Sequence, residues 1–194
     1  MRSNVLKRHS ECSFDSFIAT SEAKKKAIET CKAFANADWK KHNGLILSGK
    51  TGTGKNHLAV SILRHKIIGL IQATDVFNAT KMSDSDRFCL RPPDFTRELT
   101  TASVIVRKIK ETWHNNDRTE TEIIEAYSKM TLLIVDEVGV GYNSDTEKMF
   151  ITEIINNRYE NCLPTILMTN LTVSGLTTAI GDRAVSRVAE GGVV

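Results

Sequence analysis

One short stretch decides the fold class of this chain, and it reads Gly49-Lys50-Thr51-Gly52-Thr53-Gly54-Lys55-Asn56. The skeleton G-x-x-x-x-G-K is that of a phosphate-binding loop. Its glycines let the backbone curl closely around phosphate oxygens, and backbone N–H groups at the start of a helix bind those oxygens. The stretch therefore predicts a nucleotide-binding site in which Lys55 contacts the β- and γ-phosphates.

The residues on both sides of this loop have the pattern that such a loop requires. The apolar run Leu45-Ile46-Leu47 predicts a short strand before it. After the loop, apolar residues recur with helical spacing from Lys55 to about Ile68, and Gly69 is expected to end that helix. Two glycines and a lysine at these offsets arise by chance in about 5% of chains of this length. The flanking strand and helix favour a genuine site.

A second candidate site lies at the end of the run Leu132-Leu133-Ile134-Val135-Asp136-Glu137. Four apolar residues predict a strand that is covered on both faces and delivers two carboxylates to the carboxyl edge of a parallel sheet. Asp136 is expected to hold Mg²⁺, and Glu137 to orient and activate the attacking water. The adjacent carboxylates favour attack by water over transfer to an acceptor, although a kinase uses a similar loop.

The residue after the lysine departs from the ordinary motif. Asn56 stands where the motif has Ser or Thr, whose hydroxyl binds Mg²⁺. An amide oxygen also coordinates a hard cation, so Asn56 is a second candidate metal ligand. ATP and Mg²⁺ are the expected cofactors. A nucleotide-gated binding module without useful hydrolysis stays open as an alternative.

Predicted strands and helices alternate along the rest of the chain. Helices are expected over about 21–38, 103–113 and 120–127, and strands over 99–102 and 165–168. This alternation predicts an α/β fold of three layers, with a central parallel sheet flanked by helices. No sustained pattern occurs between Leu70 and Arg97, and a loop this long within a domain is functional or mobile.

Composition narrows the class of protein without naming a function. The chain has 194 residues, of which 41% are hydrophobic and 25% charged, as expected of one globular domain. Its apolar runs are too short to span a bilayer and no signal peptide is recognisable, so we expect a cytoplasmic protein without a membrane partner. The four cysteines form no CxxC pair, which argues against a zinc site, and the net charge of +3 neither requires nor excludes nucleic acid.

Several segments resemble the DnaC-type replicative helicase loaders, a DnaC/IstB-like family of AAA+ ATPases. The residues from Gly49 to Ala59, with Asn and His after the lysine, resemble the phosphate loop of that family. Cys12 to Phe17 resembles the short element before its first helix, and Leu133 to Gly139 resembles its acidic strand end. Motif and resemblance together give nine nucleotide-binding residues: Gly49, Lys50, Thr51, Gly52, Thr53, Gly54, Lys55, Asn56 and His57.

Two further segments acquire roles only through the resemblance. The strand from Pro164 to Asn170 is similar to the one that ends in sensor 1, which implies that Asn170 contacts the attacking water and the γ-phosphate. Residues 181–187 resemble the arginine-finger segment, which implies that Arg183 reaches the nucleotide of a neighbouring subunit, with Arg187 as a second candidate. Such an arginine stabilises the transferred phosphoryl group, so hydrolysis would depend on assembly. Without the resemblance, these residues read as a turn residue and surface charges.

The resemblance implies an ATPase of DNA replication that is slow alone and stimulated by assembly or DNA. Its implied partners are a replicative DNA helicase, single-stranded DNA and further copies of the chain. Residues 1–20 are expected to form an extension and 21–194 the AAA+ domain, with 70–98 as an insertion. The family's helicase-docking region and last strand are expected to be absent. A transposition helper ATPase and a monomeric P-loop kinase are the alternatives.

Overall fold

Four parallel strands form the centre of the molecule. The computed structural model describes residues 9, 11–73, 95–114, 117–141, 145–190, 192 and 194, with the side chains of 71–73 left out. The strands are β1 (Gly44–Ser48), β2 (Arg97–Thr101), β3 (Leu132–Asp136) and β4 (Thr165–Thr169). They pair in the order β1-β4-β3-β2, and every pairing is parallel.

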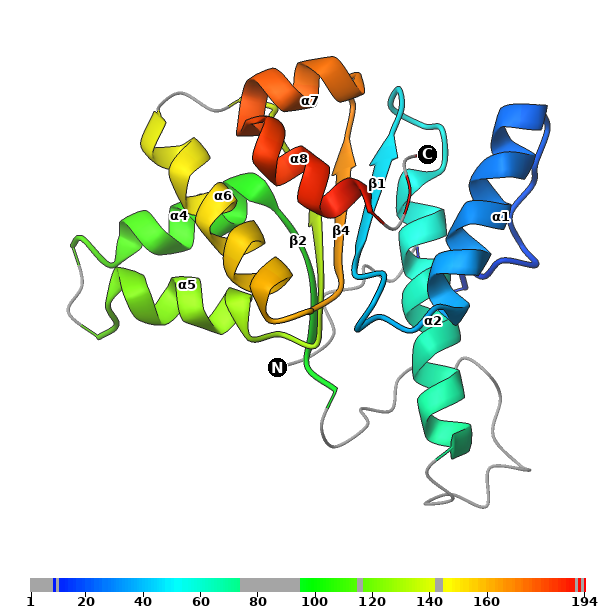
Figure 1. Cartoon of the computed structure of the whole chain (residues 1–194), viewed down its shortest axis with the longest axis horizontal. Coiled ribbons are helices and arrows are strands. Elements are labelled where there is room, and N and C mark those ends of the chain that lie inside the picture. Colours follow the sequence, from blue (N-terminus) through cyan, green and yellow to red (C-terminus); the bar gives the residue numbers. More distant parts are fainter. Residues whose placement is uncertain are drawn as a thin grey trace.

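Helices cover both faces of this sheet (Figure 1), which confirms the predicted three-layer α/β class. On one face lie α1 (Glu22–Asn36) and α2 (Lys55–Ala73). On the other lie α4 (Ala102–Glu111), α5 (Glu120–Ser128), α6 (Asp145–Glu160), α7 (Val173–Ile180) and α8 (Asp182–Ala189). The crossover helices thus alternate with the strands as the sequence pattern requires.

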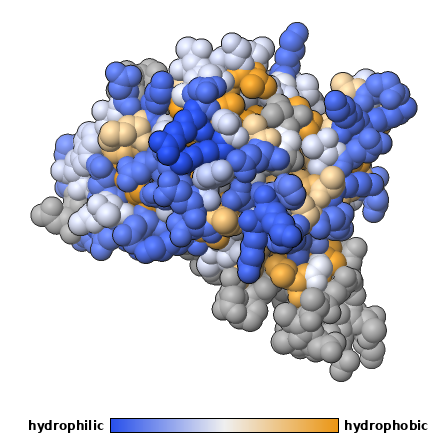
Figure 2. All heavy atoms as spheres, in the orientation of Figure 1, coloured by the Kyte–Doolittle hydropathy of each residue, from blue (hydrophilic) through white to orange (hydrophobic). Residues whose placement is uncertain are grey.

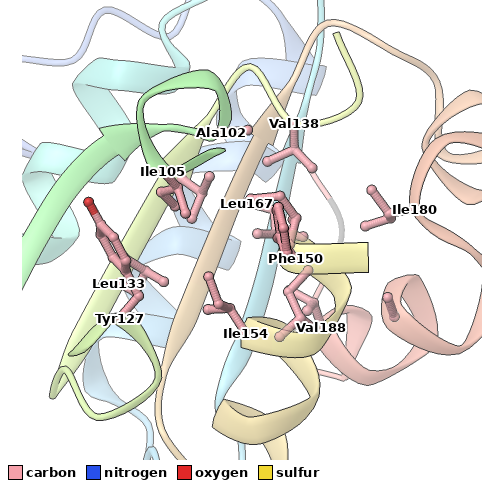
Figure 3. Packing of buried hydrophobic residues seen from close by; sticks show 14 of the residues in the cluster. Ala102, Ile105, Tyr127, Leu133, Val138, Phe150, Ile154, Leu167, Ile180 and Val188 are labelled. Carbon is pink, nitrogen blue, oxygen red and sulfur yellow. The ribbon is translucent and has the colours of Figure 1, made fainter. Parts of the chain in front are cut away.

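The strand side chains point alternately into two cores, one on each face of the sheet. Leu45 and Leu47 pack with α1 and α2, whereas Ile46 between them packs with the helices of the opposite face. Figure 3 shows that second core, where Leu133 and Leu167 from neighbouring strands meet helical side chains. Burying each such side chain contributes about 1.5–3 kcal/mol. Continuous apolar runs are therefore found in β1, β3 and β4, because both faces of these strands are covered.

Helix α2 is longer than the sequence predicts. The helix runs through Gly69 to Ala73, so the expected stop at Gly69 is wrong. Leu70 packs against the core formed with α1, and this burial offsets the helix penalty of glycine, about 1 kcal/mol. Ser21 is the N-cap of α1, and its side chain accepts a hydrogen bond from Lys24 N at 3.3 Å.

The predicted insertion at 70–98 lies largely outside the described residues. At its two ends the chain is regular, because α2 continues to Ala73 and β2 begins at Arg97.

Across the described ranges, no helix is both long and apolar enough to cross a membrane. Figure 2 shows a mainly hydrophilic face on which hydrophobic residues form small separate groups.

The edge of β1 that faces away from β4 forms hydrogen bonds with the last residues of the chain. Ile46 N donates to Gly192 O at 3.1 Å, and Val194 N donates in turn to Ile46 O at 2.9 Å. Ser48 N donates to Val194 O at 2.6 Å. This alternation of donors and acceptors is that of a parallel ladder.

Candidate nucleotide-binding site

Three strands end side by side at the carboxyl edge of the sheet. Because β4 lies between β1 and β3, the loop after β4 separates the other two. The phosphate loop follows Ser48, Asn170 follows Thr169, and Glu137 follows Asp136. Ligands of open α/β sheets bind at this edge, and the strand order thus gathers the three predicted elements of one site there.

The phosphate loop forms a tight turn that leads directly into α2, which begins at Lys55. Thr53 Oγ1 donates to Lys50 O at 2.8 Å and closes the turn. Gly54 has φ +104°, and a Cβ at this position would lie 2.7 Å from Phe17 Cε2. Glycine is required there both by the backbone conformation and by the phenyl ring that packs on the loop.

Lys55 is folded back over its own loop and reaches Asn170. Its Nζ donates to Gly49 O and Asn170 Oδ1, each at 2.6 Å, and to Lys50 O at 3.1 Å. Burial lowers the pKa of Lys55, while the nearby Asp136 carboxylate opposes that shift. Because an ammonium group only donates, the amide oxygen of Asn170 faces Lys55, and its NH₂ group stays available for another acceptor.

The acidic strand end is held in a strained conformation. Asp136 Oδ1 accepts a hydrogen bond from Glu137 N at 2.8 Å. Glu137 has φ +57°, in the left-handed region that is unfavourable for non-glycine residues by about 1–2 kcal/mol. The next residue, Val138, is fully buried, and its N–H donates to Met168 O at 3.0 Å. Strain of this kind is concentrated at functional sites, and here it fixes an exposed carboxylate beside Asp136.

The side-chain oxygen of Asn56 has no hydrogen-bond partner among the described residues. Asn56 Oδ1 is buried and forms no hydrogen bond within the part of the chain that the structure describes. Buried polar atoms are nearly always paired, so an unpaired oxygen at the start of α2 fits a ligand of a bound cation. With the Asp136 carboxylate, Asn56 provides the hard oxygen donors that Mg²⁺ prefers.

His57 is directed toward the N-terminal segment. Its Nε2 lies 2.8 Å from Ser13 O and 3.2 Å from Ser16 Oγ. The imidazole ring also packs edge-on against Phe17, with ring centroids 5.3 Å apart. The role of His57 in nucleotide binding stays a prediction, and its side chain contacts the segment that carries Phe17. In the sequence, the resemblance of residues 12–17 to a family element is the feature that indicates a role for this segment.

The two arginines of α8 differ in their surroundings. Arg187 is 13% exposed and donates to Asn156 Oδ1 at 2.6 Å, with its guanidinium 4.7 Å from the Tyr159 ring centroid. Arg183 is exposed and forms no side-chain hydrogen bond or ion pair with any residue in the described ranges. Of these two arginines, Arg183 is therefore the one whose guanidinium is free to reach another molecule.

Arg183 lies away from the phosphate loop of its own chain. Helix α7 starts at Val173, just beyond Asn170, and runs away from the end of β4 (Figure 1). Its eight residues span about 12 Å, and α8 with Arg183 begins at the far end. The structure thus brings Lys55, Asn170 and the acidic pair together, but it does not bring Arg183 to them.

Fold and site together define a P-loop protein of the AAA+ class. Residues 96–189 match the family model described as IstB-like ATP binding protein. The replicative helicase loader DnaC of Buchnera aphidicola subsp. Baizongia pistaciae is 30% identical over 188 residues, which are 96% of this chain and 67% of the relative. The chain belongs to the DnaC family of replicative helicase loaders.

Two further comparisons agree with this assignment. DnaC of Escherichia coli K12 is 27% identical over 192 residues, which cover 96% of this chain and 66% of the relative. The chain thus spans about two thirds of the length of these curated relatives. A crystal structure of the DnaC helicase loader has the same fold, with a TM-score of 0.70 at 20% identity, over 97% of this chain and 99% of that one.

Proposed function

We propose that this chain binds ATP with Mg²⁺ and hydrolyses it in the course of loading a replicative DNA helicase. The observation that carries the proposal is the contact of 2.6 Å between Lys55 Nζ and Asn170 Oδ1, with the Asp136–Glu137 pair on the adjacent strand. A phosphate-loop lysine, a polar amide and an acidic pair at neighbouring strand ends are the parts that phosphoryl transfer to water requires.

ATP binding involves an exchange of partners at Lys55. In the present structure the ammonium group bonds to two backbone carbonyls and to the neutral amide of Asn170. Phosphate oxygens form shorter and roughly twice as strong hydrogen bonds with a cation, so the β- and γ-phosphates displace those partners. The N–H groups of the loop after Gly49 contribute further donors at the start of α2.

Asn56 and Asp136 are the proposed ligands of Mg²⁺. Mg²⁺ held by these two side chains would supply positive charge beside the phosphates during transfer. Replacing Asn56 by Ala removes the unpaired amide oxygen, so we expect a higher Mg²⁺ concentration to be needed for half-maximal turnover. An unchanged Mg²⁺ titration would remove Asn56 from the ligand set.

Glu137 and Asn170 are proposed to act on the attacking water. The Glu137 carboxylate is exposed at the sheet edge and accepts the proton of the water. The NH₂ group of Asn170, which faces away from Lys55, donates to the water or to the γ-phosphate. The two side chains follow adjacent strands, so one water is able to contact both.

Completion of the site requires a second copy of the chain. Arg183 lies at the far end of α7 and has no partner among the residues described, so we propose that it contacts the nucleotide of a neighbouring copy. Ile180, at the end of α7, and residues of α6 line an open groove of about 520 Å³ that includes the half-exposed Met149. We propose that this groove forms part of the contact between copies.

The partners beyond the chain are proposed from the relatives. Those relatives are named replicative helicase loaders, so a replicative helicase is the expected partner. We propose single-stranded DNA as a further partner on the family resemblance alone. We assign the AAA+ domain to residues 21–194. Segment 11–17 packs on its phosphate loop through Phe17 and on α2 through His57, so it belongs to the site as well as to the N-terminal extension.

Arg183→Ala is expected to lower ATP turnover by about 10³-fold, as loss of an arginine finger does, while ATP affinity is kept. Arg187→Ala serves as the control, because it removes contacts within one chain and should lower thermal stability more than turnover. Turnover is measured at high protein concentration with single-stranded DNA. Equal losses of affinity and turnover in Arg183→Ala would refute the finger role.

Mixing two inactive variants separates action in trans from action in cis. Lys55→Ala retains Arg183, and Arg183→Ala retains the phosphate loop, so a mixed assembly contains complete composite sites. We expect the mixture to regain part of the parental turnover. If the mixture stays inactive although both variants assemble, the arginine acts within its own chain or not at all.

A further inference from the structure

One buried hydroxyl joins the loop that carries Glu137 to the loop that carries Asn170. Thr169 is the last residue of β4 and is 0% exposed. Its Oγ1 donates to Val138 O at 2.8 Å and accepts from Leu171 N at 3.1 Å. A threonine hydroxyl has one donor and two acceptor sites, so both bonds form at once. The residue after Glu137 is thereby tied to the residue after Asn170.

The same strand end is also fastened to the phosphate loop. Gly49 N donates to Thr169 O at 3.2 Å, and Ser48 Oγ donates to Leu171 O at 2.6 Å. These two bonds hold the end of β4 against β1, whereas the Thr169 hydroxyl holds it against the loop after β3. The end of β4 is thus the common support of all three parts of the site.

We propose that Thr169 is a positioning residue for ATP hydrolysis, a role that rests on the proposed function. Its hydroxyl fixes the separation between the Glu137 carboxylate and the Asn170 amide, which must face the same water. The strained backbone at Glu137 needs such support, because a residue with φ +57° returns to a relaxed conformation once its neighbours release it. Thr169 is fully buried and acts only through these two loops.

Thr169→Val tests the role because it keeps the shape of the side chain and removes both hydrogen bonds. A misplacement of about 1 Å lowers rates by up to about 100-fold, so we expect kcat to fall by about tenfold or more. The bonds of Lys55 and of the phosphate loop remain, so the Kd for ATP should stay within about twofold. Thr169→Ser retains the hydroxyl and should restore kcat to within about threefold of the parent.

Thr165→Val is the matched control at the opposite end of the same strand. Thr165 is also buried, accepts from Arg158 Nε at 2.9 Å and donates to Leu163 O at 3.2 Å. The substitution removes the same kind of bonds far from the site. We expect a lower melting temperature and an unchanged kcat for this variant, which separates positioning from general stability.

Steady-state hydrolysis of labelled ATP measures kcat, single-turnover hydrolysis with protein in excess measures the rate constant of the hydrolysis step, and calorimetry measures Kd. A parental kcat in Thr169→Val, or parallel loss of Kd and kcat, overturns the positioning role. A fall of kcat in Thr165→Val equal to that in Thr169→Val also overturns the positioning role. If Glu137→Gln is inactive while Thr169→Val is fully active, only the role of Thr169 fails. If the parent does not hydrolyse ATP at all, the proposed function fails together with this role.

Discussion

Glu137→Gln is expected to lower ATP hydrolysis by about 10²–10⁴-fold while ATP remains bound, because a general base contributes that much to the rate. The amide keeps the size of the side chain but does not accept the proton of the attacking water. The phosphate contacts of Lys55 and the loop are untouched, so ATP affinity should equal that of the parent. Rapid-filtration binding and single-turnover hydrolysis on the same sample measure the two quantities.

The strained backbone at this position supplies an internal check on the site. With φ at +57°, Glu137→Gly should be more stable than Glu137→Ala by about 1 kcal/mol, the reverse of the usual preference for alanine. Both variants should be inactive. A Glu137→Gln protein with parental turnover would remove Glu137 as the catalytic carboxylate, whatever the order of the two stabilities.

Arg158→Ala is expected to lower the free energy of unfolding by about 4 kcal/mol, the upper range for a single substitution. Arg158 is fully buried in α6, and its guanidinium donates to Tyr127 O at 2.8 Å and to Met130 O and Pro164 O at 2.7 Å each. Alanine removes the donor of Tyr127 O and Met130 O, at about 1–3 kcal/mol each before relaxation, whereas Pro164 O keeps its bond from Leu133 N. Urea denaturation followed by circular dichroism measures the loss.

Arg107→Ala is the control for Arg158→Ala. Arg107 lies on α4 with 67% of its side chain exposed, and its ion pair with Glu111 measures 3.8 Å. An exposed pair of this kind contributes at most about 1 kcal/mol, so the control should unfold close to the parental urea concentration. If the two variants lose similar amounts of stability, the buried hydrogen-bond network is not what holds α5, β3 and β4 together.

The parts of the site that depend on local pattern could be predicted from the sequence. The phosphate loop is one continuous stretch between a strand and a helix, and the acidic pair ends a single apolar run. Parallel strands place such ends at one edge of the sheet. The presence of Lys55, Asp136 and Asn170 at one site is therefore predictable from periodicity, motif and resemblance. The strand predicted over 99–102 begins two residues after the observed start of β2 at Arg97, because the half-buried residues of β2 lack a continuous apolar run.

The parts that depend on contacts between distant residues could not be predicted. His57 and Ser13 are 44 positions apart, and Thr169 and Val138 are 31 apart, so no local pattern links either pair. The distinction between Arg183 and Arg187 is of the same kind, since α6 supplies the partners of Arg187. The predicted helix end at Gly69 is wrong because burial of Leu70 outweighs the low helix preference of glycine.

The central claim is that the loop at the start of α2 binds the phosphates of ATP through Lys55. Calorimetric titration of ATP with Mg²⁺ into the pure, folded protein tests this claim most directly. The account predicts one site per chain, and a roughly 10- to 150-fold weaker Kd for Lys55→Ala, the equivalent of about 1.5–3 kcal/mol of hydrogen bonding to a charged group. Lys40→Ala, which removes an exposed lysine outside the site, should bind like the parent. Absence of binding heat with ATP and with ADP, or a Lys55→Ala protein that binds as the parent does, would contradict the claim.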